Sequence, residues 1–166
     1  MKLRLFVGIT APPQWKRAIT EWRRKIEPRF TDSFARWTSE ENLHLTLRFF
    51  GSVEEADAVA IGKALQKVIA GAQSFSVSAG ELGCFPNASR PRIVWLGLKK
   101  ETDALIKLES NLRAATATLG QAPEERDFHP HLTLARVKEA RRQDRDALDE
   151  LIRKLEELRR SSGKAA

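Results

Sequence analysis

Apolar and polar residues alternate along several short stretches of the chain, a pattern typical of strands with one buried face. The first stretch is the clearest, because Leu3, Leu5, Val7 and Ile9 share one parity. Residues 92–98 are almost continuously apolar, as in a central strand. The sequence therefore predicts five strands, at residues 2–9, 43–50, 74–80, 92–98 and 131–137.

Between the strands, apolar residues recur at the spacing of one helical face. The first helix is predicted behind Pro12 and Pro13 and stops at Pro28, and a second follows a capping box of Ser52 and Glu55. The remaining boundaries are Gly71 for the end of the second helix, Thr102 and Gly120 for a third helix, a loop at 83–91, a charged last helix from about Arg142 to Arg160, and a frayed tail at 161–166.

The order of elements contains an internal repeat. A strand, a helix and the tetrapeptide His-Leu-Thr-Leu occur from residue 3 to 50 and again from 92 to 137, and a helix is predicted behind each copy. This order predicts an α+β fold, with residues 1–166 forming one domain of two pseudo-symmetric lobes. Each lobe would be a small, mainly antiparallel sheet with helices on its outer face, and a cleft would lie between the lobes.

Composition narrows the class of protein. The chain has 166 residues and a single cysteine, so no internal disulfide can form. It has no secretory signal at its start and no stretch that approaches the ~20 apolar residues of a membrane span. We therefore expect a cytoplasmic protein that does not contact a membrane. The 29 basic and 22 acidic residues give a net charge of +7, which favours a polyanionic partner such as RNA.

The two tetrapeptides carry the candidate chemistry. Side chains alternate between the faces of a strand, so His44 shares a face with Thr46, and His131 shares a face with Thr133. Imidazole changes charge near neutral pH, so one ring can take a proton from water while the other gives a proton to a leaving oxygen. The threonine hydroxyls can donate hydrogen bonds to the oxygens of a phosphate. This set predicts phosphoryl transfer without a metal or a cofactor.

Other residues are weaker candidates. Arg48 has the strand parity of His44 and is predicted to reach a phosphate at the cleft edge, unless it is simply solvated. Arg136 has the parity of the buried leucines, so a role in binding requires a twist or bulge of the strand. Phe6 and Phe50 lie on the polar-side parity of their strands and are candidates for stacking on a base, although core packing is the expectation for each. No base accompanies Cys84, so no nucleophilic thiol is predicted.

These residues resemble the 2H phosphoesterase superfamily, and within it the bacterial and archaeal RNA 2′,3′-cyclic phosphodiesterases of the LigT/ThpR type. The resemblance covers residues 2 to about 137, and its most specific string starts at Phe128. The supporting strings are Arg4-Leu-Phe-Val-Gly-Ile9, Arg36-Trp37, Glu41-Asn-Leu-His-Leu-Thr-Leu-Arg-Phe-Phe-Gly51, Gly83-Cys-Phe-Pro86, Pro91-Arg-Ile-Val-Trp-Leu-Gly97 and Phe128-His-Pro-His-Leu-Thr-Leu-Ala-Arg136.

The resemblance implies a reaction and a set of roles. His44 would be the proton donor and His131 the proton acceptor in hydrolysis of an RNA 2′,3′-cyclic phosphate to a 2′-phosphomonoester. Thr46 and Thr133 would assist catalysis, and Arg48, Arg136 and Phe6 would bind the substrate, an RNA end that includes cleaved tRNA fragments. Some relatives also join such fragments in reverse. A monomer is expected, with a dimer as the alternative, and neither a metal nor a cofactor is required.

Three alternatives remain open at this point. In the family, strands follow the last helix and complete the second lobe, whereas this chain is charged and helical from about Arg142, which predicts a shortened second lobe. That departure favours an RNA- or nucleotide-binding module without turnover. A 2H enzyme acting on another cyclic or 2′–5′ nucleotide would carry the same motifs. A metal hydrolase is the third alternative, although the sequence has no cluster of ligands at metal-binding spacing.

Overall fold

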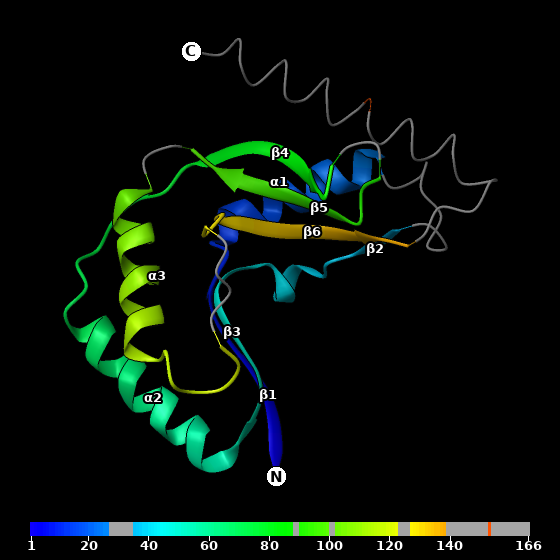
Figure 1. Cartoon of the computed structure of the whole chain (residues 1–166). Helices are drawn as coiled ribbons and strands as arrows, with labels where there is room; N and C mark the ends of the chain where they lie inside the picture. The colour runs from blue at the N-terminus through cyan, green and yellow to red at the C-terminus, as the bar shows by residue number, and fades with distance from the viewer. Residues whose placement is uncertain (27–34, 88–89, 100–101, 123–126, 139–152, 154–166) are drawn as a thin grey trace. The chain divides into compact units, whose positions relative to one another are not determined.

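Figure 1 shows the computed structural model of the chain, which describes residues 1–26, 35–87, 90–99, 102–122, 127–138 and 153. The predicted last helix and frayed tail lie outside these residues, apart from Arg153. The elements are β1 (Lys2–Thr10), α1 (Pro13–Ile26), β2 (Ala35–Trp37), the 3₁₀ helix η2 (Glu40–Asn42), β3 (His44–Glu54), α2 (Glu55–Ala70), β4 (Ala79–Phe85), β5 (Ile93–Leu98), α3 (Asp103–Ala115) and β6 (His131–Val137).

The chain forms two compact units, and each unit is assembled from three separate segments of the sequence. Unit 1 contains Met1–Ile9, Thr46–Ser78 and Leu98–Pro130, and unit 2 contains the rest. The predicted two-lobed α+β fold is confirmed, but the sequence repeat does not divide the lobes. Strand β1 belongs to unit 1, whereas the helix that follows it, α1, belongs to unit 2. In the second copy, most of β5 belongs to unit 2 and the helix that follows it, α3, to unit 1.

Unit 1 is built from β1, most of β3, and the helices α2 and α3, which lie side by side (Figure 1). Strand β1 pairs with β3. Alternate residues of β1 pack inward, as the sequence predicts for Leu3, Leu5 and Val7. Ile9 of the same parity is instead exposed. The core they cover consists of Phe50, Val53 and Ile61, with Ala58, Leu65 and Leu119 at its edge.

Unit 2 is organised around β6, which pairs antiparallel with β5 on one side and with β2 and the start of β3 on the other. Strand β4 pairs with the far side of β5. One face of this sheet carries the core, because alternate residues of neighbouring strands meet there. The core residues are Ala35, Val94, Ala135 and Val137, against which Trp22, Trp37, Leu82 and Cys84 pack.

Strand β3 does not end at Gly51, and the predicted capping box is wrong. The strand continues to Glu54, which is the N-cap of α2 and makes no side-chain capping bond. Gly51 adopts a φ of 69° within the strand, a conformation that glycine tolerates and other residues rarely adopt. The amide of Gln121 donates to the carbonyl of Phe50 at this point, so a tertiary contact replaces the predicted turn.

The predicted strand at 74–80 is also wrong in position. Residues 72–78 have no regular structure, and β4 begins at Ala79 and runs through residues that composition assigned to a loop. Leu82 and Cys84 supply the apolar parity that joins the unit 2 core. Packing against β5 thus decides the strand, whereas the alternation around Phe75 lies on a largely exposed segment.

Candidate active site

The two His-x-Thr motifs meet on neighbouring strands of unit 2. Leu45 of β3 is the antiparallel partner of Leu132 of β6, and both leucines are buried. In this antiparallel register His44 is the partner of Thr133, and both side chains lie on the face of the sheet opposite the two leucines. His131 lies on that same face, two residues before Thr133. It is the diagonal neighbour of His44, and such neighbours have Cα atoms roughly 7–8 Å apart. Both imidazoles therefore lie on one face of the unit 2 sheet, on neighbouring strands.

The short 3₁₀ helix η2 fixes the ring of His44. Its Nδ1 lies 2.6 Å from the backbone oxygen of Asn42, the last residue of η2. A carbonyl oxygen can only accept a hydrogen bond, so Nδ1 must carry the hydrogen. The ring therefore uses Nε2 for any further proton transfer, as a donor when the imidazole is charged and as an acceptor when it is neutral.

His131 lies among aromatic rings on the same face. The ring of Phe85 meets the imidazole edge-on with centroids 5.1 Å apart, and the ring of Trp95 lies 6.2 Å from it. Trp95 covers Gly83, where an added Cβ would stand 2.3 Å from the indole. Only glycine lets the indole lie this close to β4, so the sequence at residue 83 fixes the neighbour of His131.

A β-bulge turns Arg136 toward the face of the motifs. The paired residues of β5 and β6 are Ile93↔Arg136, Val94↔Ala135 and Trp95↔Thr133. One step along β5 corresponds to two steps along β6, which makes Leu134 the extra residue. Ile93 and Trp95 share a face of β5, so their partners Arg136 and Thr133 share a face as well. The bulge that the sequence analysis required for a binding role of Arg136 is thus present.

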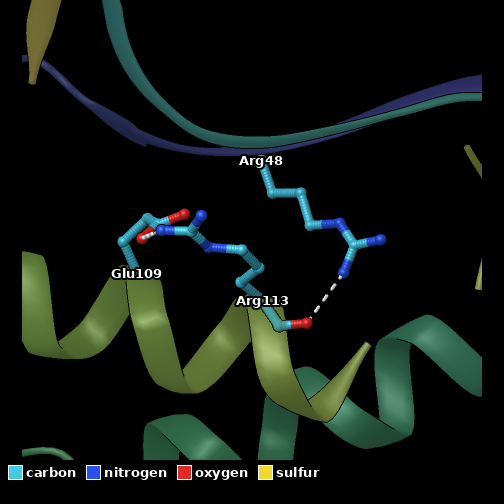
Figure 2. A network of polar contacts seen from close by, with 3 residues as sticks. All are labelled: Arg48, Glu109 and Arg113. Carbon is cyan, nitrogen blue, oxygen red and sulfur yellow. Dashed lines mark hydrogen bonds and ion pairs between the residues drawn. The ribbon is translucent and has the colours of Figure 1, made fainter. Parts of the chain in front are cut away.

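Arg48 does not lie at an exposed cleft edge, as its parity predicted. It is buried in unit 1, 6% exposed, and its guanidinium donates to the backbone oxygens of Arg113, Leu119 and Gln121 and to the Thr116 hydroxyl. Figure 2 shows it reaching from β3 to the end of α3. The alternation of β3 breaks here, because Leu47 and Arg48 are both buried. A phosphate contact at Arg48 is therefore replaced by a structural role.

The position of this guanidinium explains where α3 ends. The helix was predicted to continue to Gly120, but it stops at Ala115, because Arg48 binds carbonyl oxygens of its last turn and of the loop that follows. A cation at a helix C-terminus also interacts favourably with the helix dipole. Burial lowers the pKa of Arg48, and the nearby Glu109 carboxylate partly opposes that shift. Glu109 itself pairs with Arg113 at 2.9 Å (Figure 2).

Aromatic side chains are exposed on the strands of unit 1. Phe6 of β1 is 51% exposed, so the core packing expected of it is wrong, and its ring stays a candidate for stacking. Phe50 is buried in the core, which excludes it as a stacking platform. Phe49 is 43% exposed instead, with the guanidinium of Arg4 5.4 Å from its ring. The sequence analysis missed Phe49, although aligning residues 44–50 with 131–137 pairs it with Arg136.

The remaining candidates lie apart from this chemistry. His129 is exposed and precedes β6. Burial raises the pKa of the Cys84 thiol to about 11, which agrees with the expectation that it is not a nucleophile. Within the described ranges, no group of three or more His, Cys, Asp or Glu side chains could hold a metal ion. Among the helices of the described residues, none is long and apolar enough to cross a membrane.

Comparison with known proteins gives the same family as the motifs. The family model of LigT-like phosphoesterases matches the chain twice, over residues 9–95 and 96–164, in keeping with the internal repeat. An RNA 2′,3′-cyclic phosphodiesterase of Aeropyrum pernix is 38% identical over 116 residues, which cover 70% of this chain. The chain spans 64% of the length of that relative.

Two further comparisons agree. An RNA 2′,3′-cyclic phosphodiesterase of Thermotoga maritima is 38% identical over 136 residues, which cover 82% of this chain and 71% of that protein. The crystal structure of Escherichia coli LigT with 3′-AMP superimposes with a TM-score of 0.68 at 31% identity, covering 85% of this chain and 77% of the other. The predicted resemblance is confirmed, and the chain belongs to the family of LigT-like phosphoesterases.

Proposed function

We propose that this chain hydrolyses the 2′,3′-cyclic phosphodiester at the end of an RNA to a 2′-phosphomonoester, without a metal ion. The names of the relatives from Aeropyrum pernix and Thermotoga maritima support the reaction. The observation that carries the mechanism is the register Leu45↔Leu132, from which His44, His131 and Thr133 follow as neighbours on one face of the unit 2 sheet.

The two histidines act on opposite sides of the phosphorus atom. Neutral His131 takes a proton from a water molecule, whose oxygen attacks phosphorus as the bond from phosphorus to the 3′ oxygen breaks. Protonated His44 gives its Nε2 proton to that 3′ oxygen, so a 3′-hydroxyl and a 2′-phosphate result. The assignment of donor and acceptor follows the family. The hydrogen bond from His44 Nδ1 to the backbone oxygen of Asn42 leaves Nε2 as the ring nitrogen that transfers the proton.

The remaining residues of the proposed site bind and stabilise. Thr133 and Thr46 donate hydrogen bonds to the non-bridging oxygens, where negative charge gathers during displacement. Arg136, on the face of Thr133 through the bulge, binds RNA phosphate. In unit 1, the exposed rings of Phe6 and of Phe49 on the neighbouring strand are by themselves candidates for stacking on a base.

The test is turnover of a short RNA that ends in a 2′,3′-cyclic phosphate, in excess chelator, for the wild type, His44→Ala and His131→Ala. Each variant is expected to lose roughly 10²- to 10⁴-fold in rate, the usual contribution of a proton-transfer group. His129→Ala is the matched control, since it removes the third imidazole, and it should retain the wild-type rate. Circular dichroism verifies that all four proteins are folded.

The other outcomes distinguish the remaining alternatives. A folded wild type that binds this RNA and never cleaves it would establish a binding module. Activity that chelator abolishes and a divalent ion restores would establish a metal hydrolase. Turnover of other cyclic or 2′–5′ nucleotides in place of RNA would keep the mechanism and change the substrate.

A further inference from the structure

Two arginines stand directly opposite each other at one end of the unit 2 sheet. Strands β2 and β6 pair with Arg36 opposite Arg136, and both side chains are exposed. The residues flanking each arginine, namely Ala35, Trp37, Ala135 and Val137, belong to the core on the other face. Side chains alternate along a strand, so the two guanidinium groups lie together on the face opposite the core.

That face is the one that carries the motif residues. The bulge in β6 brings Arg136 to the side of Thr133, and the pairing with β2 brings Arg36 to the same side. Thr133 and Arg136 are separated by roughly 7–10 Å of strand. This separation is on the scale of one nucleotide of an extended RNA chain.

The pairing of two arginines is unfavourable unless an anion joins them. Like charges directly opposite each other on neighbouring strands destabilise a sheet. In the described part of the chain, neither guanidinium forms an ion pair with a carboxylate. Guanidinium groups match the geometry of phosphate oxygens through paired hydrogen bonds, and two of them can share one phosphate.

We propose that Arg36 and Arg136 together bind the RNA phosphodiester adjoining the cyclic phosphate. This inference rests on the proposed function. Under it, the unit 2 sheet holds two consecutive phosphates, one at the His and Thr side chains and one at the arginine pair. The pair therefore makes the site selective for a polynucleotide end over a free cyclic mononucleotide, which has no second phosphate.

The experiment compares two substrates, a four-nucleotide RNA ending in a 2′,3′-cyclic phosphate and 2′,3′-cyclic AMP. The proteins are the wild type, Arg36→Gln, Arg136→Gln and the double variant. Each single change should lower kcat/KM for the RNA by about tenfold and lower that for the mononucleotide far less, because the mononucleotide has no second phosphate. Because both side chains hold one phosphate, the double variant should lose less than the product of the two single losses.

Salt dependence and a matched control exclude a general effect of charge. The slope of log(kcat/KM) against log salt concentration should become shallower by about 0.7 in the double variant, the value for one phosphate contact on a single strand, and by less than that in each single variant. Arg92→Gln removes the same charge from an exposed arginine that precedes β5 and lies outside the paired residues. It should change neither the preference for RNA nor the salt slope.

Two results would overturn the proposal. Equal losses on RNA and on the mononucleotide would mean that Arg36 acts on the first phosphate or on folding, and no loss on either would mean that it is solvated. Binding of an RNA ending in a 2′-phosphate, measured by fluorescence anisotropy against 2′-AMP, gives the same contrast without turnover. If the proposed function is wrong, the wild type will not cleave the RNA. The difference in affinity between the 2′-phosphate RNA and 2′-AMP would still test the role of Arg36.

Discussion

Residues 44–50 of β3 and 131–137 of β6 bury their side chains in the same order. In each strand the His and Thr side chains are less buried than the leucines between them, and two consecutive residues are then buried before the next is exposed. The break falls at Leu47 and Arg48 in β3, and at Leu134 and Ala135 in β6. The two motifs therefore share a break in the burial pattern as well as a sequence.

The residues at equivalent positions differ in a way that assigns different tasks to the strands. Buried Arg48 corresponds to buried Ala135, and exposed Phe49 corresponds to exposed Arg136. In β3 the cation points inward and secures a helix, while an aromatic ring points outward. In β6 the small residue points inward and the cation points outward. Both copies of the repeat thus carry the imidazoles and hydroxyls, and under the proposed function Phe49 would stack on a base while Arg136 would bind phosphate.

The largest expected effect concerns the two histidines, which occupy equivalent places in the two motifs and have opposite roles in the proposed mechanism. The wild-type rate should be bell-shaped in pH, because the acceptor must be neutral and the donor charged. The residual activity of His131→Ala should lose the rise on the acid side, and that of His44→Ala the fall on the alkaline side. Profiles of kcat/KM measure both, and the reverse assignment of limbs would exchange donor and acceptor.

Replacing Arg48 should destabilise unit 1. Arg48 and Ala135 occupy equivalent buried positions, but only Arg48 has a side chain that makes hydrogen bonds there. Arg48→Met leaves carbonyl oxygens of Arg113 and of the loop behind it unpaired, at an expected cost of about 3 kcal/mol in the free energy of unfolding. Urea denaturation measures this cost. Arg4→Met, which removes an exposed arginine of β1, is the control and should cost far less. Equal costs would show that the buried hydrogen bonds contribute little.

The threonines test whether both motifs touch the phosphate. Thr46→Val and Thr133→Val keep the shape of the side chain and remove one donor, so kcat should fall by about 10- to 100-fold in each. The melting temperature should stay close to the wild-type value, because the Thr46 side chain is exposed and that of Thr133 is partly exposed. A loss in only one variant would mean that the phosphate binds asymmetrically.

The smallest effect is a chemical one and reports on the core beneath β6. With a pKa of about 11 against an ordinary value of 9.0, the Cys84 thiol is almost wholly protonated at pH 8. Disulfide exchange with an aromatic reagent should therefore be roughly 100-fold slower than for an exposed thiol, and should accelerate as the pH rises toward 11. If the Cys84 thiol of Arg48→Met reacts as slowly as in the wild type, the loss of stability is limited to unit 1. If it reacts fast, the core of unit 2 is disturbed as well.

Local pattern was sufficient for the elements whose packing follows their own periodicity. Strands β1, β5 and β6 and helix α1 were predicted within about two residues. Strand β2 was missed, because three residues carry no period, and only pairing with β6 makes Ala35–Trp37 a strand. The end of α3 was misplaced because the guanidinium that ends it comes from β3, more than sixty positions away in the sequence.

The site divides in the same way. The tetrapeptides predicted the His and Thr side chains as the candidate site directly, and the buried leucines beside them confirm the alternation on which that prediction depends. Parity failed one step later, because it assumes a regular strand. It directed Arg48 outward, it left Arg136 in need of a bulge, and it chose Phe50 over Phe49. A bulge is set by pairing with a neighbouring strand, so alternation along one strand cannot reveal it.

The central place of β6 bears on how the chain is made. Its partners β2, β3 and β5 are all synthesised earlier, and the sheet of unit 2 cannot close until residues 131–137 have left the ribosome. Until then the core residues of β2, β3 and β5 lack the strand with which all three pair. Such non-local pairing folds slowly and leaves apolar surface exposed in the meantime. The strand that completes the sheet also brings His131, so the nascent chain gains its second imidazole in the same step that lets it fold.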